Sequence, residues 1–268
     1  HPVPVDGVAA AGPYPLQVAV VPRSEVALPG DLPCEPVEGA LDRGLEVLAG
    51  TFSFTPDGKR LVYVAFKDEK WVVFDGEHIS PAYDGIIQGS LTLSPDGTRV
   101  AYAAKKGNMF FVVVDGRAHP PHDNISAERF LFSPDGRNLA YVAKDGDKER
   151  VVLNGREGPT YDICGCPVFS PGGERLAYSA RKGRTCFVVV DGREVAKYDG
   201  IGKNSLAFSP DGNRLAYVAV KDGQQCMVVD GREGPTRDGI GSRLLFGPNG
   251  NRWAYVGKRN NKWFVMSD

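Results

Sequence analysis

The chain has 268 residues, of which 42% are apolar and 24% are charged, proportions typical of a folded globular protein. Its formal net charge of −1 gives no electrostatic basis for binding nucleic acid or an anionic membrane surface. No apolar run is long enough to cross a bilayer, so we expect no membrane span.

Residues 1–36 form the first segment, which is set apart by prolines at positions 2, 4, 13, 15, 22, 29, 33 and 36. Because proline fixes φ and removes a hydrogen-bond donor, we expect an extended arm with one candidate strand at residues 16–21. The chain begins at His1 rather than at methionine. A removed signal peptide would account for this start, which predicts a periplasmic or secreted protein.

One motif then occurs six times, with residues 208–219 (Phe-Ser-Pro-Asp-Gly-Asn-Arg-Leu-Ala-Tyr-Val-Ala) as its fifth copy. Its prolines lie at positions 56, 95, 134, 171, 210 and 248, at intervals of 39, 39, 37, 39 and 38 residues. A period of about 40 residues indicates an architecture built by repeating one supersecondary unit.

The fifth copy shows what this unit contains. A short apolar strand at residues 206–209 is turned by Pro-Asp-Gly, and a second strand follows at 214–219. A third strand at 226–229 ends in Asp-Gly, the strongest short hairpin signal, and a weaker fourth strand follows at 234–237. Four antiparallel strands repeated in this way predict an all-β fold, a six-bladed β-propeller of four-stranded antiparallel blades.

The two ends of the repeat region predict how the ring closes. The sixth copy stops at Asp268, after its third strand at residues 263–266, so its fourth strand is missing. Residues 38–45 match residues 233–240 in spacing. We therefore expect residues 37–46 to supply the outer strand of the last blade, within a propeller domain of residues 37–268 that follows the proline-rich arm.

Residues 132–141 and 208–217, with the Val-Val-Val-Asp-Gly-Arg and Tyr-Asp-Gly-Ile segments at 188–193 and 198–201, resemble the bacterial WD40-like repeat of the PD40 or TolB type. The resemblance covers about residues 37–268, although no Trp-Asp dipeptide ends the third strands. It implies the propeller fold. Proteins of this kind serve as protein-interaction platforms, as parts of envelope complexes, and as accessory domains of peptidases and sugar-degrading enzymes.

The sequence contains no recognisable catalytic or metal-binding constellation. No Gly-x-Ser-x-Gly elbow is present, and Ser133, Ser170 and Ser209 all occupy the repeated turn before proline. His119 and His122 have a spacing that could suit a metal, but no third ligand is evident, and His122 aligns with aromatic positions. We therefore expect no catalytic residue, no metal and no cofactor.

The cysteines leave two interpretations open. Cys164 and Cys166 lie in a loop of the fourth copy, which is two residues shorter than its neighbours, and Cys186 begins a third strand. They are either small packed side chains or, for Cys164 or Cys166 with Cys186, a disulfide whose geometry the sequence cannot show.

Two sets of charges recur along the repeats, six cations and five aspartates. A cation follows each second strand and is expected to form a ring on one face: Lys67, Lys105, Lys144, Arg181, Lys221 and Lys258. A set of aspartates precedes the next copy and is expected to cap turns: Asp84, Asp123, Asp162, Asp199 and Asp238.

The leading hypothesis is a non-enzymatic propeller scaffold that binds a protein or peptide partner through the loops of one face. Its candidate binding residues are the six cations together with Trp71, His119 and His122. The alternative is a propeller-type lyase or hydrolase acting on a glycan or small ester at the channel mouth, where Arg129 and Arg243 are expected to lie. A third hypothesis is a structural domain of a larger envelope protein. The sequence leaves open the partner, the functional face and the oligomeric state.

Overall fold

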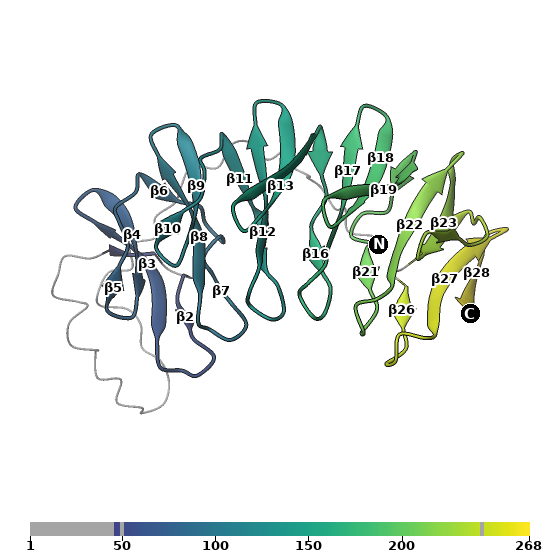
Figure 1. Cartoon of the computed structure of the whole chain (residues 1–268), viewed down its shortest axis with the longest axis horizontal. Coiled ribbons are helices and arrows are strands. Elements are labelled where there is room, and N and C mark those ends of the chain that lie inside the picture. Colours follow the sequence, from purple (N-terminus) through teal and green to yellow (C-terminus); the bar gives the residue numbers. More distant parts are fainter. Residues whose placement is uncertain (1–45, 49–50, 242–243) are drawn as a thin grey trace, which may run out of the picture.

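The computed structural model describes residues 46–48, 51–241 and 244–268, and these residues form strands and turns without a helix. No helix that could span a membrane is therefore present in this part of the chain. The strands make six antiparallel sheets, numbered here 1 to 6 in chain order (Figure 1). The all-β prediction is confirmed.

Sheet 1 contains β1 (Glu46–Val47), β2 (Ser53–Phe54), β3 (Leu61–Lys67), β4 (Lys70–Asp75) and β5 (His78–Ile79). Sheet 2 contains β6 (Gly85–Ile86), β7 (Thr92–Leu93), β8 (Val100–Lys106), β9 (Met109–Val114) and β10 (Arg117–Ala118). Sheet 3 contains β11 (Asn124–Phe132), β12 (Leu139–Asp145), β13 (Lys148–Leu153) and β14 (Arg156–Tyr161). Sheet 4 contains β15 (Ile163–Cys164), β16 (Val168–Phe169), β17 (Leu176–Lys182), β18 (Thr185–Val190) and β19 (Arg193–Tyr198). Sheet 5 contains β20 (Gly200–Ile201), β21 (Ala207–Phe208), β22 (Leu215–Lys221), β23 (Gln224–Val229) and β24 (Arg232–Glu233). Sheet 6 contains β25 (Gly239–Ile240), β26 (Leu245–Phe246), β27 (Trp253–Arg259) and β28 (Lys262–Ser267).

Sheets 1 to 5 follow the strand order expected of a propeller blade, and sheet 6 has the same order without the outer strand among the described residues. In sheet 5, β20 and β21 are two pieces of one inner strand that both pair with β22, and β22 pairs in turn with β23. The outer strand β24 pairs with β23, so the chain crosses the sheet as an antiparallel meander. The predicted four-stranded antiparallel unit is confirmed.

The Pro-Asp-Gly turn is held by its own side chains. In the fifth copy, Ser209 Oγ donates to Asp211 Oδ1 and accepts from the Arg214 backbone N–H at 2.9 Å. Gly212 has a φ of +73°, a conformation that glycine adopts without steric cost. The hydrogen bond from Ser209 lowers the pKa of Asp211, so the carboxylate stays ionised as an acceptor. This supports the structural interpretation of the repeated serine and aspartate.

The arginine after the turn ties each sheet to the next. The Arg214 guanidinium donates through Nε to Asp230 at 2.8 Å and through Nη1 to the Gly250 carbonyl of sheet 6 at 3.1 Å. It also lies over the Phe246 ring, 5.7 Å from its centroid. Arg99 and Arg175 make equivalent bonds to the turns that follow them. The motif therefore links neighbouring blades as well as turning each one.

The hydrophobic core lies between neighbouring sheets rather than within one. Between sheets 4 and 5, Val188 of β18 packs in one buried cluster with Leu206, Tyr217 and Val228 of sheet 5. Val188 and Val228 are fully buried and Leu206 is 5% exposed. Because both faces of an inner sheet are covered, its strands are apolar on both sides, as the Val-rich third strands indicate.

The six sheets follow one another in an open arc, with sheets 1 and 6 at opposite ends (Figure 1). The expected ring closure is therefore not seen in this structure. Most of the predicted closing strand, residues 37–45, and the arm of residues 1–36 lie outside the described residues. Glu46, the last residue of that predicted strand, pairs with Phe66 of β3 in sheet 1.

The outward faces of the two end sheets carry exposed apolar side chains. On sheet 1 these are Phe52 and Phe54, which are 56% and 64% exposed. On sheet 6, Leu245 and Val265 are 74% and 77% exposed. Strand register makes Val265 equivalent to Met227 of β23, which is only 2% exposed because sheet 6 covers it. The ends of the arc thus display surfaces that are buried elsewhere in the molecule.

Candidate functional site

Strand register divides the six predicted cations between two positions. Lys105, Lys144, Arg181 and Lys258 lie opposite the first inner-strand residue of their sheets. In sheets 1 and 5 this position holds Phe66 and Val220 instead. Lys67 and Lys221 come one residue later, and successive side chains on a strand point to opposite faces. The prediction of six equivalent cations is therefore wrong for Lys67 and Lys221.

Several of these cations have local partners. Lys221 forms an ion pair with Glu233 at 3.2 Å, and the ammonium groups of Lys105 and Lys258 lie over the Phe110 and Trp263 rings. Exposed pairs of this kind contribute little to stability, about 0–1 kcal/mol each. Among the six cations, Lys67 and Lys258 are half-buried, and the others are exposed: Lys105, Lys144, Arg181 and Lys221.

The predicted capping role of the recurring aspartates is confirmed. Each one accepts, through a carboxylate oxygen, a backbone N–H from the loop between the second and third strands of its sheet. The pairs are Asp84 with Gly107, Asp123 with Gly146, Asp162 with Gly183, Asp199 with Asp222, and Asp238 with Asn260, at 2.6–2.9 Å. These carboxylates belong to the scaffold.

The two histidines and Trp71 are packed rather than freely exposed. His122 is 1% exposed, lies edge-on to the Tyr141 ring and has its Nδ1 3.0 Å from Asp145 Oδ2. The backbone of His122 forms an antiparallel bridge with Phe110, as that of Tyr83 does with Trp71. This confirms the prediction that His122 occupies a position held by an aromatic residue in other copies. His119 stacks on Tyr141, and burial lowers the pKa of its imidazole. Trp71 packs against the core between sheets 1 and 2.

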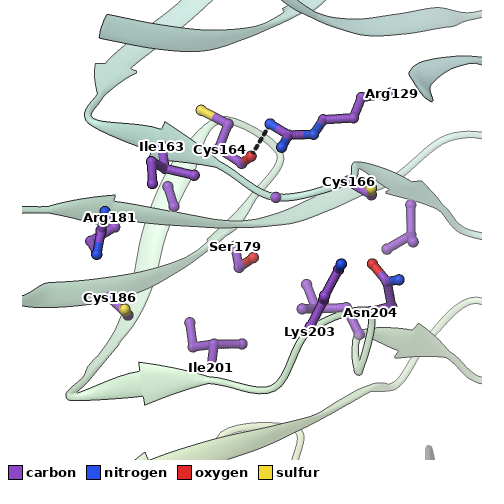
Figure 2. Close-up of a pocket in the computed structure, with 14 residues that line it drawn as sticks. Arg129, Ile163, Cys164, Cys166, Ser179, Arg181, Cys186, Ile201, Lys203 and Asn204 are labelled. Carbon is purple, nitrogen blue, oxygen red and sulfur yellow. Dashed lines mark hydrogen bonds between the residues drawn. The ribbon is translucent and has the colours of Figure 1, made fainter. Parts of the chain in front are cut away.

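A cavity of about 700 Å³ opens between sheets 4 and 5, and it is lined from three sheets (Figure 2). Arg129 reaches it from β11 of sheet 3. The inner strand and loop of sheet 4 supply Ile163, Cys164, Gly165 and Cys166, and sheet 5 supplies Ile201, Lys203 and Asn204. Ser179, Arg181 and Cys186, from β17 and β18, also line it.

The shortened fourth copy explains why the cavity is here. In sheet 5, Ser205 fills the corresponding space, and its Oγ accepts the Val218 N–H at 3.1 Å. Strand register makes Ser179 of sheet 4 equivalent to Val218 of sheet 5. The loop at Cys166 is two residues shorter than the loop of sheet 5 and has no serine equivalent to Ser205. Gly165 lies so close to β17 that an added Cβ would overlap Ser179 Oγ. Cys166 and Ser179 line the cavity at the place where the two residues are missing.

The charged residues around the cavity are cations. Arg129 Nη1 donates to the Cys164 carbonyl at 2.6 Å and to Glu149 at 3.0 Å, so its guanidinium is fixed at the cavity wall. In Figure 2, Arg181 lies at one side of the opening, and Lys203 and Asn204 lie at the other. No Asp or Glu of the described chain lines the cavity, so its local charge is positive.

The cysteines of the described residues are free thiols, so the disulfide alternative is not realised in this structure. Cys164 is fully buried, and burial raises the pKa of its thiol to about 12. A thiol in that state is a poor nucleophile. The described cavity lining also contains no histidine or carboxylate that would act as a general base. Its chemistry is that of anion binding.

Of the cavity residues, sequence analysis identified Arg181 as a binding candidate and Arg129 as part of the alternative enzyme site. Lys203, Asn204 and Ser179 were missed. The 37-residue interval between the third and fourth copies was the signal that pointed to this loop. The predicted companion of Arg129, Arg243, lies outside the described residues.

No protein-family model and no curated protein matches this chain. Among solved structures, it is similar to TolB from Acinetobacter baumannii (18% identity, TM-score 0.35), covering 72% of this chain and 56% of that one. It is also similar to the β-propeller domain of the Trilobed protease from Pyrococcus furiosus (14% identity, TM-score 0.40), covering 81% and 80%. A third similar structure is the dihydro-heme d1 dehydrogenase NirN (16% identity, TM-score 0.39), covering 82% and 54%. The chain thus spans about half the length of two of these three proteins.

Proposed function

We propose that the chain is a non-enzymatic six-bladed β-propeller scaffold that binds a protein or peptide partner through one face. The face is the one that carries the loops between second and third strands. The observation that supports it most is the cationic cavity between sheets 4 and 5, which exists because one copy of the repeat departs from the others. Binding residues commonly lie on loops positioned by a rigid scaffold, and ligand sites are concave, as this cavity is.

The proposal includes a closed ring, in which the outward faces of sheets 1 and 6 pack on each other. Phe52 and Phe54 would then bury against Leu245 and Val265, as Leu206 buries against Val188 between sheets 4 and 5. Burying each such side chain contributes about 1.5–3 kcal/mol. Closure would require a change of angle at each contact between neighbouring sheets. Residues 37–45 are proposed to add the outer strand of sheet 6, because Glu46 belongs to the inner strand of sheet 1.

A periplasmic or secreted location follows from the same proposal, because the TolB-type resemblance of the repeats is to bacterial envelope proteins. The alternative activity, a lyase or hydrolase acting on a glycan or ester, would need a general base at the binding face. A screen for hydrolysis or elimination with such substrates tests it directly, and turnover would replace the scaffold proposal.

Panning a phage-displayed peptide library on the immobilised full chain tests the binding role. Matched variants are possible because the second strand of each sheet has one end on each face. In sheet 5, β22 begins after the Pro-Asp-Gly turn and ends at Lys221. The Arg181→Gln/Lys221→Gln variant removes two positive charges from the proposed face. The Lys59→Gln/Arg137→Gln variant is the control and removes two positive charges from the face that carries the Pro-Asp-Gly turns.

The proposal predicts that enriched peptides bind the first variant about tenfold more weakly than the unaltered chain, because charge-assisted contacts are lost. They should bind the second variant as they bind the unaltered chain. Failure to enrich any peptide, or equal binding by the unaltered chain and the first variant, would contradict it.

A further inference from the structure

The cavity between sheets 4 and 5 has a charge and a shape that restrict what it can hold. Arg181 and Lys203 are exposed, and neither has a carboxylate within ion-pair distance among the described residues. Asp162 lies near Arg181, but its carboxylate is already paired with Lys148 at 2.7 Å. Two cations at the opening therefore remain available to an incoming anion.

Apolar side chains form much of the cavity wall between these cations, and Ser179 lines it beside them. Ile163 is 42% exposed, and Ile201, Val168 and Leu206 line the same space. In Figure 2, Ile201 lies below Ser179, between Arg181 on one side and Lys203 on the other. A ligand that satisfies this lining has anionic groups at its two ends and an apolar group between them.

We propose that this cavity binds an acidic peptide segment in which carboxylates flank an aliphatic side chain. The carboxylates would pair with Arg181 and Lys203, and the aliphatic side chain would contact Ile163 and Ile201. This rests on the proposed peptide-binding function and adds the class of peptide and the place where it binds. A volume of about 700 Å³ accommodates several residues of a peptide, whereas a lone inorganic phosphate would leave the apolar walls uncovered.

Fluorescence anisotropy with the full chain and a fluorescein-labelled Glu-Leu-Glu-Leu-Glu peptide tests the inference. The same peptide with Gln in place of Glu, one with Gly in place of Leu, and inorganic phosphate as a competitor separate the charge and apolar contributions. Lys203→Gln and Arg181→Gln each remove one cation. Arg184→Gln is the matched control, because Arg184 is an exposed cation of the neighbouring loop that does not line the cavity.

We expect the acidic leucine peptide to bind, with affinity falling as salt is added. Each cavity variant should weaken binding about three- to tenfold, and the Arg184→Gln chain should bind within about twofold of the unaltered one. The Gln and Gly peptides should bind more weakly, and phosphate should compete poorly.

Equal binding by the unaltered and Lys203→Gln chains would overturn the inference, as would phosphate competing as well as the peptide does. Library-selected peptides that lose affinity for the Arg181→Gln/Lys221→Gln variant but not for Lys203→Gln would overturn this assignment while leaving the proposed face intact.

Discussion

Replacing Gly97 with alanine is expected to lower the free energy of unfolding by about 2 to 4 kcal/mol. Gly97 has a φ of +71°, which an alanine adopts only at a cost of about 1 kcal/mol or more. An added Cβ would also overlap Pro56 Cδ and lie 3.1 Å from Thr55 Cβ, both in the preceding sheet. A proline ring cannot move aside as a flexible chain would, so the backbone must shift.

Gly58 provides a matched position, since it occupies the same turn in sheet 1 with a φ of +68° and has no atom within 4 Å of an added Cβ. In the open arc, Gly58→Ala would carry only the conformational cost. In a closed ring, the sixth turn would lie against it as the first turn lies against Gly97. We therefore expect Gly58→Ala to destabilise the chain as much as Gly97→Ala does, measured by denaturant unfolding. A loss of about 1 kcal/mol would instead indicate that sheet 1 has no neighbour on that side.

Replacing Arg214 with alanine is expected to cost about 2 kcal/mol, because its guanidinium makes charged hydrogen bonds to Asp230 and to the carbonyls of Gly250 and Asn251, and the bond to Gly250 is partly buried. Leaving those carbonyls without a donor adds to the cost. The substitution also removes the contact of the Arg214 guanidinium with the Phe246 ring.

Arg252 is the equivalent residue of sheet 6, and its side chain is 79% exposed with one distant ion pair, 3.7 Å from Asp268. In the open arc its removal would cost about 0–1 kcal/mol. Ring closure would give Arg252 the carbonyls of the first turn and the exposed Phe54 ring as partners. We therefore expect Arg252→Ala and Arg214→Ala to have similar effects in thermal and denaturant unfolding. A negligible effect of Arg252→Ala alone would argue against closure.

The blades could be predicted from sequence because the signals that build them are local. Pro-Asp-Gly and Asp-Gly each specify a reversal within four residues, as the positive φ of Gly212 and Asp230 illustrates. The aromatic slot of His122 was found in the same way, by aligning copies. These features depend on residues that are neighbours in the chain.

The position of the cations was harder to predict, because a shift of one residue on a strand changes the face to which a side chain points. Lys67 and Lys221 lie next to Phe66 and Val220, and only the pairing register distinguishes the two positions.

The cavity depends on contacts between sheets that no single copy encodes. The short loop at Cys166 could be read from the repeat intervals, but Arg129 and Lys203 come from the sheets on either side. Predicting their convergence requires the distance and angle between blades. Those quantities are set by side-chain packing across the whole interface, to which no local motif corresponds.

A distance between the two end sheets distinguishes a closed ring from an open arc. Nitroxide labels would be placed at Lys59→Cys and Asn251→Cys, which follow the turns of sheets 1 and 6, in a chain whose Cys34, Cys166 and Cys186 are replaced by serine. The reference pair, Asn213→Cys and Asn251→Cys, spans the neighbouring sheets 5 and 6. Dilution with unlabelled chain removes distances between molecules.

Pulsed electron spin resonance should then give the same distance distribution for the end pair as for the reference pair. An end-pair distance far longer than the reference, as the open arc of Figure 1 requires, would contradict the closed propeller.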